Sequence, residues 1–218
     1  MKRIVKKQLK GDEFVSTLTK ILQFIKKRIK EIIIVAAAVV FFILLYLGLR
    51  FIQAQNLKKE SQLLSRLLEL RSELATKPDN IAKLEQLAGR GKFSRLGYVF
   101  TATYWVEKGD LEKAKAALGK IQAEPKDFIY YQAEELLAQI NFLEKNYDQA
   151  IAIYKKIEEQ KHQDYALDAI LYHKAEALEG KGEKQEALMV YKKLQEEFPQ
   201  SYYGMDAAEK VRKLKVAQ

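Results

Sequence analysis

The pattern of apolar and polar residues divides the chain into one uninterrupted apolar run and longer stretches with helical periodicity. The apolar run is IIIVAAAVVFFILLYLGL over residues 32–49, which carries no charge and lies between Glu31 and Arg50. A helix of this length covers about 27 Å, close to the thickness of the hydrocarbon core of a bilayer. The pattern therefore predicts a transmembrane helix over residues 32–52.

A basic amphipathic segment, residues 1–31, precedes this run. Apolar residues between Phe14 and Ile29 recur mostly at steps of three or four, which places them on one face of a helix. Ten Lys or Arg residues lie in the same segment. Two interpretations fit this pattern: the helix lies on anionic membrane lipid, or it docks on another membrane protein.

The distribution of charge predicts the orientation. Residues 1–52 hold 11 Lys or Arg against three acids, whereas residues 53–218 hold 27 against 26 acids. The positive-inside rule places the basic excess on the cytoplasmic side. We therefore expect a single-pass protein with its N-terminus in the cytoplasm and residues 53–218 outside. The balanced charge of the outer region also argues against nucleic acid as a partner.

A cleaved signal peptide is the alternative to a retained anchor, because Ile52-Gln53-Ala54 weakly resembles a cleavage site. The basic region before the apolar run is long, and the run exceeds the about 7–15 residues that are usual for a signal peptide. These features favour the anchor. The chain contains no Cys, which excludes disulfides and a lipid-modified cysteine.

The segment over residues 53–92 is predicted to form a leading helix pair. A long helix from Gln53 to Leu74 ends before Lys77-Pro78-Asp79, because the residue before a proline avoids the helical region. A shorter helix follows over Asp79–Ala88, and two glycines then break the chain. The first helix carries a broad apolar stripe of Leu63, Leu64, Leu67, Leu68, Leu70 and Leu74.

Residues 93–200 repeat one pattern three times. Two sets of alanines each recur at offsets of 36 and 37 residues, and the two alanines of a unit are always 12 residues apart. This spacing indicates two helices joined by a tight turn, with small residues where the helices touch. The first set is Ala102, Ala138 and Ala175, and the second is Ala114, Ala150 and Ala187.

This pattern resembles the tetratricopeptide repeat, whose period is about 34 residues. The additional residues are expected between units, at 122–126 and 160–163, and Asn141 stands where that repeat usually has an aromatic residue.

Residues 201–218 are predicted to form a capping helix, with Ala207, Ala208, Val211 and Leu214 on one side and Asp206, Glu209, Lys210 and Lys213 on the other. The predicted fold is all-α: one transmembrane helix followed by a tetratricopeptide-like α-solenoid.

The sequence offers no recognisable catalytic site. The only two histidines, His162 and His173, have no companion at metal-binding spacing and are interpreted as surface residues. Paired acids are adjacent in sequence and therefore point in different directions on a helix. We predict no catalytic residue, cofactor, metal or small-molecule substrate, and hence a protein that is not an enzyme.

Partner binding is expected on the first helices of the repeats, which line the concave surface in this repeat class. Tetratricopeptide domains that capture a peptide carboxylate use Lys, Asn and Arg there, and this chain does not. A groove of mixed apolar and acidic character fits an extended client chain, and a solvated face is the alternative. The candidate contact residues are Glu135, Gln139, Tyr172 and Glu176.

Two stretches resemble the YfgM-like family, the ancillary subunits of the SecYEG translocon. They are the KGDEFV motif at residues 10–15, before a basic helix and one spanning helix, and FSRLGYVFTATYWVEKGDLEKAKAALGKI at residues 93–121. The resemblance implies a bacterial inner-membrane protein with a periplasmic repeat domain beside the translocon and periplasmic chaperones. The ending EEFPQSYYGMDAAEKVRKL also looks like envelope repeat proteins of the outer-membrane-assembly and Tol-associated kinds, so an envelope-assembly scaffold is the alternative.

Overall fold

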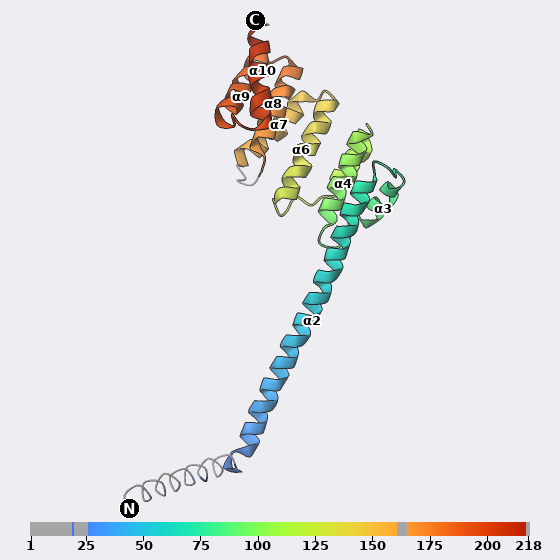
Figure 1. Cartoon of the computed structure of the whole chain (residues 1–218), viewed down its shortest axis with the longest axis vertical. Coiled ribbons are helices and arrows are strands. Elements are labelled where there is room, and N and C mark those ends of the chain that lie inside the picture. Colours follow the sequence, from blue (N-terminus) through green and yellow to red (C-terminus); the bar gives the residue numbers. More distant parts are fainter. Residues whose placement is uncertain (1–18, 20–25, 161–164, 217–218) are drawn as a thin grey trace, which may run out of the picture. The chain divides into compact units, whose positions relative to one another are not determined.

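The structure, a computed structural model, describes residue 19 and residues 26–160 and 165–216, and this part of the chain is helical with no strand. The all-α prediction is therefore confirmed. The basic helix predicted over residues 1–31 lies largely outside the described residues. Figure 1 shows the helices α2 (Ile29–Glu73), α3 (Asn80–Leu87), α4 (Ser94–Glu107), α5 (Leu111–Leu118), α6 (Phe128–Leu143), α7 (Tyr147–Gln160), α8 (Leu167–Lys181), α9 (Lys184–Glu197) and α10 (Tyr202–Val216).

The chain forms two compact bodies, Met1–Lys59 and Glu60–Gln218. The described part of the first body is mainly the apolar portion of α2, which is long and apolar enough to cross a membrane. Its large side chains are exposed, Phe42 by 65% and Ile34 by 68%. A helix suits an apolar surrounding because it satisfies its backbone hydrogen bonds internally. Length and composition are those of a membrane span or a signal anchor.

The second body begins with the last turns of α2, which pack against α3 and α4. Leu67, Leu70 and Leu74 are buried there together with Leu84 of α3. The predicted leucine stripe is wrong at Leu68, which is 49% exposed. A helix turns by about 100° per residue, so Leu68 points well away from the side that buries Leu67. The packing face of α2 is narrower than the sequence pattern suggested.

Three helix pairs follow, one for each repeat. The first unit is α4 with α5, the second is α6 with α7, and the third is α8 with α9. All six alanines of the repeat pattern are fully buried, and the two alanines of each unit belong to the same core cluster. Small side chains let two helix backbones approach closely, which explains why alanine recurs at these positions. The predicted contact between the two helices of each unit is confirmed.

The turn inside each unit is tight, and its backbone is left-handed at the same place every time. Gly109, Lys145 and Gly182 occupy equivalent positions with φ angles of 77°, 63° and 93°. Glycine adopts this conformation without steric cost, whereas a residue with a Cβ atom is strained. Lys145 therefore carries the turn of the second unit at an energetic disadvantage that the two flanking helices compensate.

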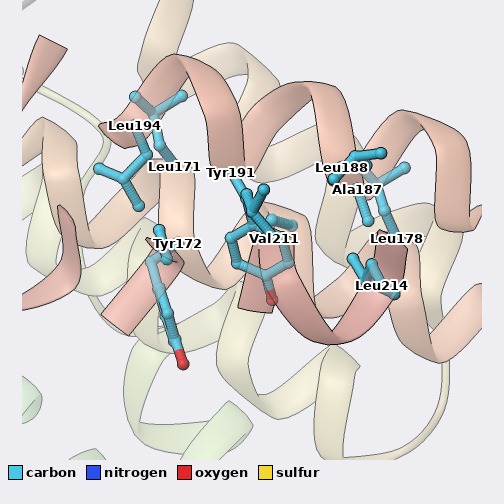
Figure 2. Close-up of a cluster of buried hydrophobic side chains, with 11 residues drawn as sticks. Leu171, Tyr172, Leu178, Ala187, Leu188, Tyr191, Leu194, Val211 and Leu214 are labelled. Carbon is cyan, nitrogen blue, oxygen red and sulfur yellow. The ribbon is translucent and has the colours of Figure 1, made fainter. Parts of the chain in front are cut away.

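The closing helix α10 covers the last pair. Ala207, Val211 and Leu214 are buried against α8 and α9, as predicted for a cap. Figure 2 shows the side chains of Leu171, Tyr191, Val211 and others from these three helices converging on one cluster. The stack thus ends in a helix that buries one side and leaves residues such as Met205 exposed.

We expect Ala187→Leu to lower the free energy of unfolding by about 1–3 kcal/mol, because a larger side chain overpacks the contact between α8 and α9. Thermal unfolding followed by circular dichroism measures the effect, with Ala152→Leu on the exposed side of α7 as the matched control. If Ala187→Leu melts at the same temperature as the control, the helices do not meet at this alanine.

Candidate functional site

A polar surface of the stack that also contains aromatic rings lies on α6, α8 and α10. We call it the α6–α8–α10 face. The predicted contact residues belong to it, and the structure adds five more side chains to them. Its members are Glu135, Gln139, Tyr165, Tyr172, His173, Glu176, Tyr203, Asp206 and Lys210.

Tyr172 connects α8 to the cap. Its side chain is only 8% exposed, and its ring centre lies 5.1 Å from that of Tyr203 and 5.7 Å from that of Tyr191. The hydroxyl lies at the edge of the buried cluster in Figure 2 and donates a hydrogen bond to Asp206 of α10. Burial and this hydrogen bond raise the pKa of the Tyr172 hydroxyl, so it stays a donor at neutral pH.

A network of charged side chains continues from Tyr172 along α8. The Glu176 carboxylate lies 3.1 Å from Nδ1 of His173 and 3.7 Å from Nζ of Lys210, and Lys210 also binds Glu179 at 3.1 Å. Glu176 and Lys210 are 30% and 29% exposed. A partner can therefore reach both charges, which are already held in place by their neighbours.

The two predicted residues on α6 differ in their surroundings. Glu135 accepts a hydrogen bond from the hydroxyl of Tyr165, whereas Gln139 is exposed, one turn further along the helix. Burial raises the pKa of Tyr154, and the charges of Glu135 and Glu176 raise it further. Glu135 on α6 and Glu176 on α8 therefore both add negative potential at the Tyr154 hydroxyl.

Tyr165 and Tyr203 were given no role from the sequence, and three further members of the face have roles that differ from those expected. His173, expected to be a surface residue, is half-buried beside the rings of Tyr172 and Tyr203, with centres 5.7 and 5.5 Å away. Asp206 and Lys210, assigned to the outer side of the cap, bind side chains of α8 instead. No sequence signal identifies these contacts, because they depend on the angle at which α10 crosses α8. His162 lies outside the described residues.

The α6–α8–α10 face provides hydrogen-bonding side chains and the edges of aromatic rings. Among the described residues no group of three or more His, Asp and Glu side chains forms a metal site. Each carboxylate of the face already interacts with a tyrosine, a lysine or the histidine. Such a surface is suited to holding a polypeptide by several weak contacts.

Comparison with known protein families also identifies tetratricopeptide repeats in this chain. A profile described as a tetratricopeptide repeat-like domain matches residues 23–169, and a tetratricopeptide repeat profile matches residues 169–201. No curated protein and no solved structure matches this chain. Tetratricopeptide repeats are typically non-catalytic scaffolds that mediate interactions between proteins. Since the first profile covers about two thirds of the chain, the chain belongs to the tetratricopeptide repeat-like domain family.

Proposed function

We propose that this protein is a membrane-anchored scaffold of the bacterial inner membrane, an accessory of the protein-export translocon that helps to pass emerging proteins to periplasmic chaperones. The observation that carries the proposal is the direct connection of one long apolar helix, α2, to a stack of tetratricopeptide-like helix pairs. A scaffold attached in this way works at a membrane surface on other proteins.

The composition of the membrane anchor favours binding to a partner protein within the membrane. Residues 32–49 contain no charged or strongly polar side chain and no GxxxG motif, so the helix has little with which to bind a second copy of itself. The basic residues before it favour a cytoplasmic N-terminus. We therefore propose that residues 1–52 associate with the membrane and with a different membrane protein, the SecYEG translocon.

The outer stack supports contact with exported chains. The α6–α8–α10 face combines exposed polar residues such as Gln139 with partly exposed charges such as Glu176 and tyrosine rings. A surface that makes several weak contacts binds many sequences weakly, as an export accessory requires. We propose that Glu135, Gln139 and Glu176 contact clients, and that the buried Tyr172 positions Asp206 and the cap beside them.

The role beside the translocon is taken from the resemblance of residues 10–15 and 93–121 to the YfgM-like family. An envelope-assembly scaffold is the second candidate, favoured by the ending at residues 196–214, which looks like repeat proteins of the outer-membrane-assembly and Tol-associated kinds. Such proteins are lipoproteins or soluble, whereas this chain has no Cys and has a long apolar helix. This difference favours the translocon role.

Crosslinking in native membranes, followed by identification of the attached proteins, distinguishes the two candidates. We expect translocon subunits to be attached to the full chain, and we expect deletion of residues 1–52 to abolish this complex. The remaining residues 53–218 should stay folded, because they contain the repeat core and its cap. Attachment only to outer-membrane-assembly or cell-wall proteins would support the second candidate and contradict the first.

A second variant tests the α6–α8–α10 face. Glu135→Ala, Gln139→Ala and Glu176→Ala combined with Tyr172→Phe should reduce crosslinks to exported chains while the membrane complex persists. The matched control changes three exposed residues of α9 to Ala: Glu186, Lys192 and Glu196. Client crosslinks that are equally strong in the variant and the control would show that the face is only a solvated surface.

A further inference from the structure

A separate pocket lies on the first unit, away from the α6–α8–α10 face. Its volume is about 300 Å³, and it opens between α3, α4 and α5. We call it the Trp105 pocket, after the single tryptophan of the chain. Its lining consists of Glu85, Ala88, Tyr98, Thr101, Trp105, Lys113, Ala116, Ala117 and Lys120.

The aromatic wall of this pocket is held in place. The indole Nε1 of Trp105 donates a hydrogen bond of 2.9 Å to Glu85 of α3, and Nζ of Lys113 lies 4.1 Å from the centre of the indole. Lys113 also pairs with Asp110 at 2.8 Å. Trp105 is nevertheless only half-buried. A fixed, partly open indole is a surface on which an apolar side chain can pack without first ordering the protein.

Two adjacent small residues of α5 line the pocket, a pair that neither of the other units has. Ala117 corresponds to Ile153 in the second unit and to Val190 in the third, at the repeat offsets of 36 and 37. Ile153 and Val190 are partly buried and pack against their own core clusters. Ala116 corresponds to Ala152 and then to Met189. Only in the first unit is the residue small at both places.

The same comparison shows that one lysine lacks the acidic partner that the equivalent lysines have. Lys120, Lys156 and Lys193 are equivalent. Lys156 pairs with Glu134 at 2.9 Å, and Lys193 pairs with Glu158 at 2.6 Å. Within the described part of the chain Lys120 forms no ion pair and only faces the ring of Tyr98, 5.6 Å from its centre.

Tyr98 occupies in the first unit the position that Glu134 occupies in the second. The position of Glu158, 35 residues before its lysine, is held by Glu85, whose carboxylate accepts a hydrogen bond from Trp105 and forms no ion pair with Lys120. An aromatic ring attracts a lysine more weakly than a carboxylate does, and it leaves the ammonium group able to bind an anion. The first unit therefore offers an apolar pocket with an unneutralised cation at its rim.

The charge of the surrounding region points to an anionic ligand. Residues 60–121 hold 11 Lys or Arg against eight acids, whereas residues 122–218 hold 14 against 18 acids. The outer region is balanced as a whole but basic in its first part and acidic in its last part. The Trp105 pocket lies in the basic part, where the local potential attracts acidic segments and repels basic ones.

We propose that the Trp105 pocket binds an acidic peptide segment of a partner protein, with one bulky apolar side chain of the peptide against Trp105 and a carboxylate on Lys120. The carboxylate supplies the partner that Glu134 and Glu158 supply to the equivalent lysines of the later units. A volume of about 300 Å³ is at the small end of ligand pockets, which suits one side chain of a peptide rather than a large cofactor. This site is independent of the proposed client surface.

The fluorescence of Trp105 tests the proposal, because no other tryptophan contributes to it. The full chain in detergent micelles is titrated with the capped peptide acetyl-Glu-Asp-Leu-Asp-Glu-amide, with tryptophan excited selectively. We expect a saturable shift of the emission to shorter wavelength, and weaker binding at higher salt. A peptide with Ala for the central Leu, and a peptide with Lys for the four acids, should each bind at least about tenfold more weakly.

Three variants locate the binding. Lys120→Glu should weaken binding of the acidic peptide at least about tenfold, and so should Ala116→Met, which places in the first unit the residue of the third. Ala116 is exposed, so this change fills the pocket without disturbing the core. The control is Lys192→Glu, the same charge reversal at an exposed lysine of α9, which should leave the affinity within about twofold.

Several outcomes would overturn the proposal. They are the absence of a saturable change in Trp105 emission, equal affinity for the acidic and the lysine peptides, and undiminished binding by both Lys120→Glu and Ala116→Met. Circular dichroism melts of each variant show whether a loss of binding comes with a loss of fold. If Lys120→Glu is unfolded, Ala116→Met and the peptide series decide the question.

Discussion

The close approach of two helices at a pair of alanines is the contact on which the outer part of this protein depends. It occurs once in each unit, and all six alanines are fully buried. A helix pair of this kind cannot bury its apolar side alone, so each unit requires the next and the last requires a cap. The alanines therefore determine the register of the core residues that bind the units together, such as Tyr154 and Tyr191.

Most of the fold follows from the sequence because its signals are periodic. The uncharged run, the alanine offsets and the glycines of the turns each identify a helix or a turn from nearby residues. The α6–α8–α10 face could be predicted only in part, since Glu135, Gln139, Tyr172 and Glu176 come from a repeat position, whereas Asp206, Lys210 and the half-buried His173 depend on how helices cross. Leu68 shows the same limit, because an apolar residue can lie beside a packing face without joining it.

Departures from the repeat carry more functional information than the repeat itself. Ala116 and Ala117, which are replaced by Met189 and Val190 in the third unit, line the pocket beside Trp105. Tyr98 stands where the second unit has Glu134, so Lys120 faces an aromatic ring where Lys156 pairs with a carboxylate. The basic and acidic parts of the outer region add a second distinction, so one stack can offer surfaces of opposite charge to different proteins.

The proposed function requires the repeat stack to lie outside the cytoplasmic membrane and the N-terminus inside. The chain has no Cys, so single cysteines can report the side of each part. Intact cells that carry Lys192→Cys or Lys7→Cys are treated with a membrane-impermeant maleimide, and permeabilised cells serve as the control. We predict labelling of position 192 in intact cells and of position 7 only after permeabilisation. Protection of position 192, or labelling of position 7 in intact cells, would contradict the proposed orientation.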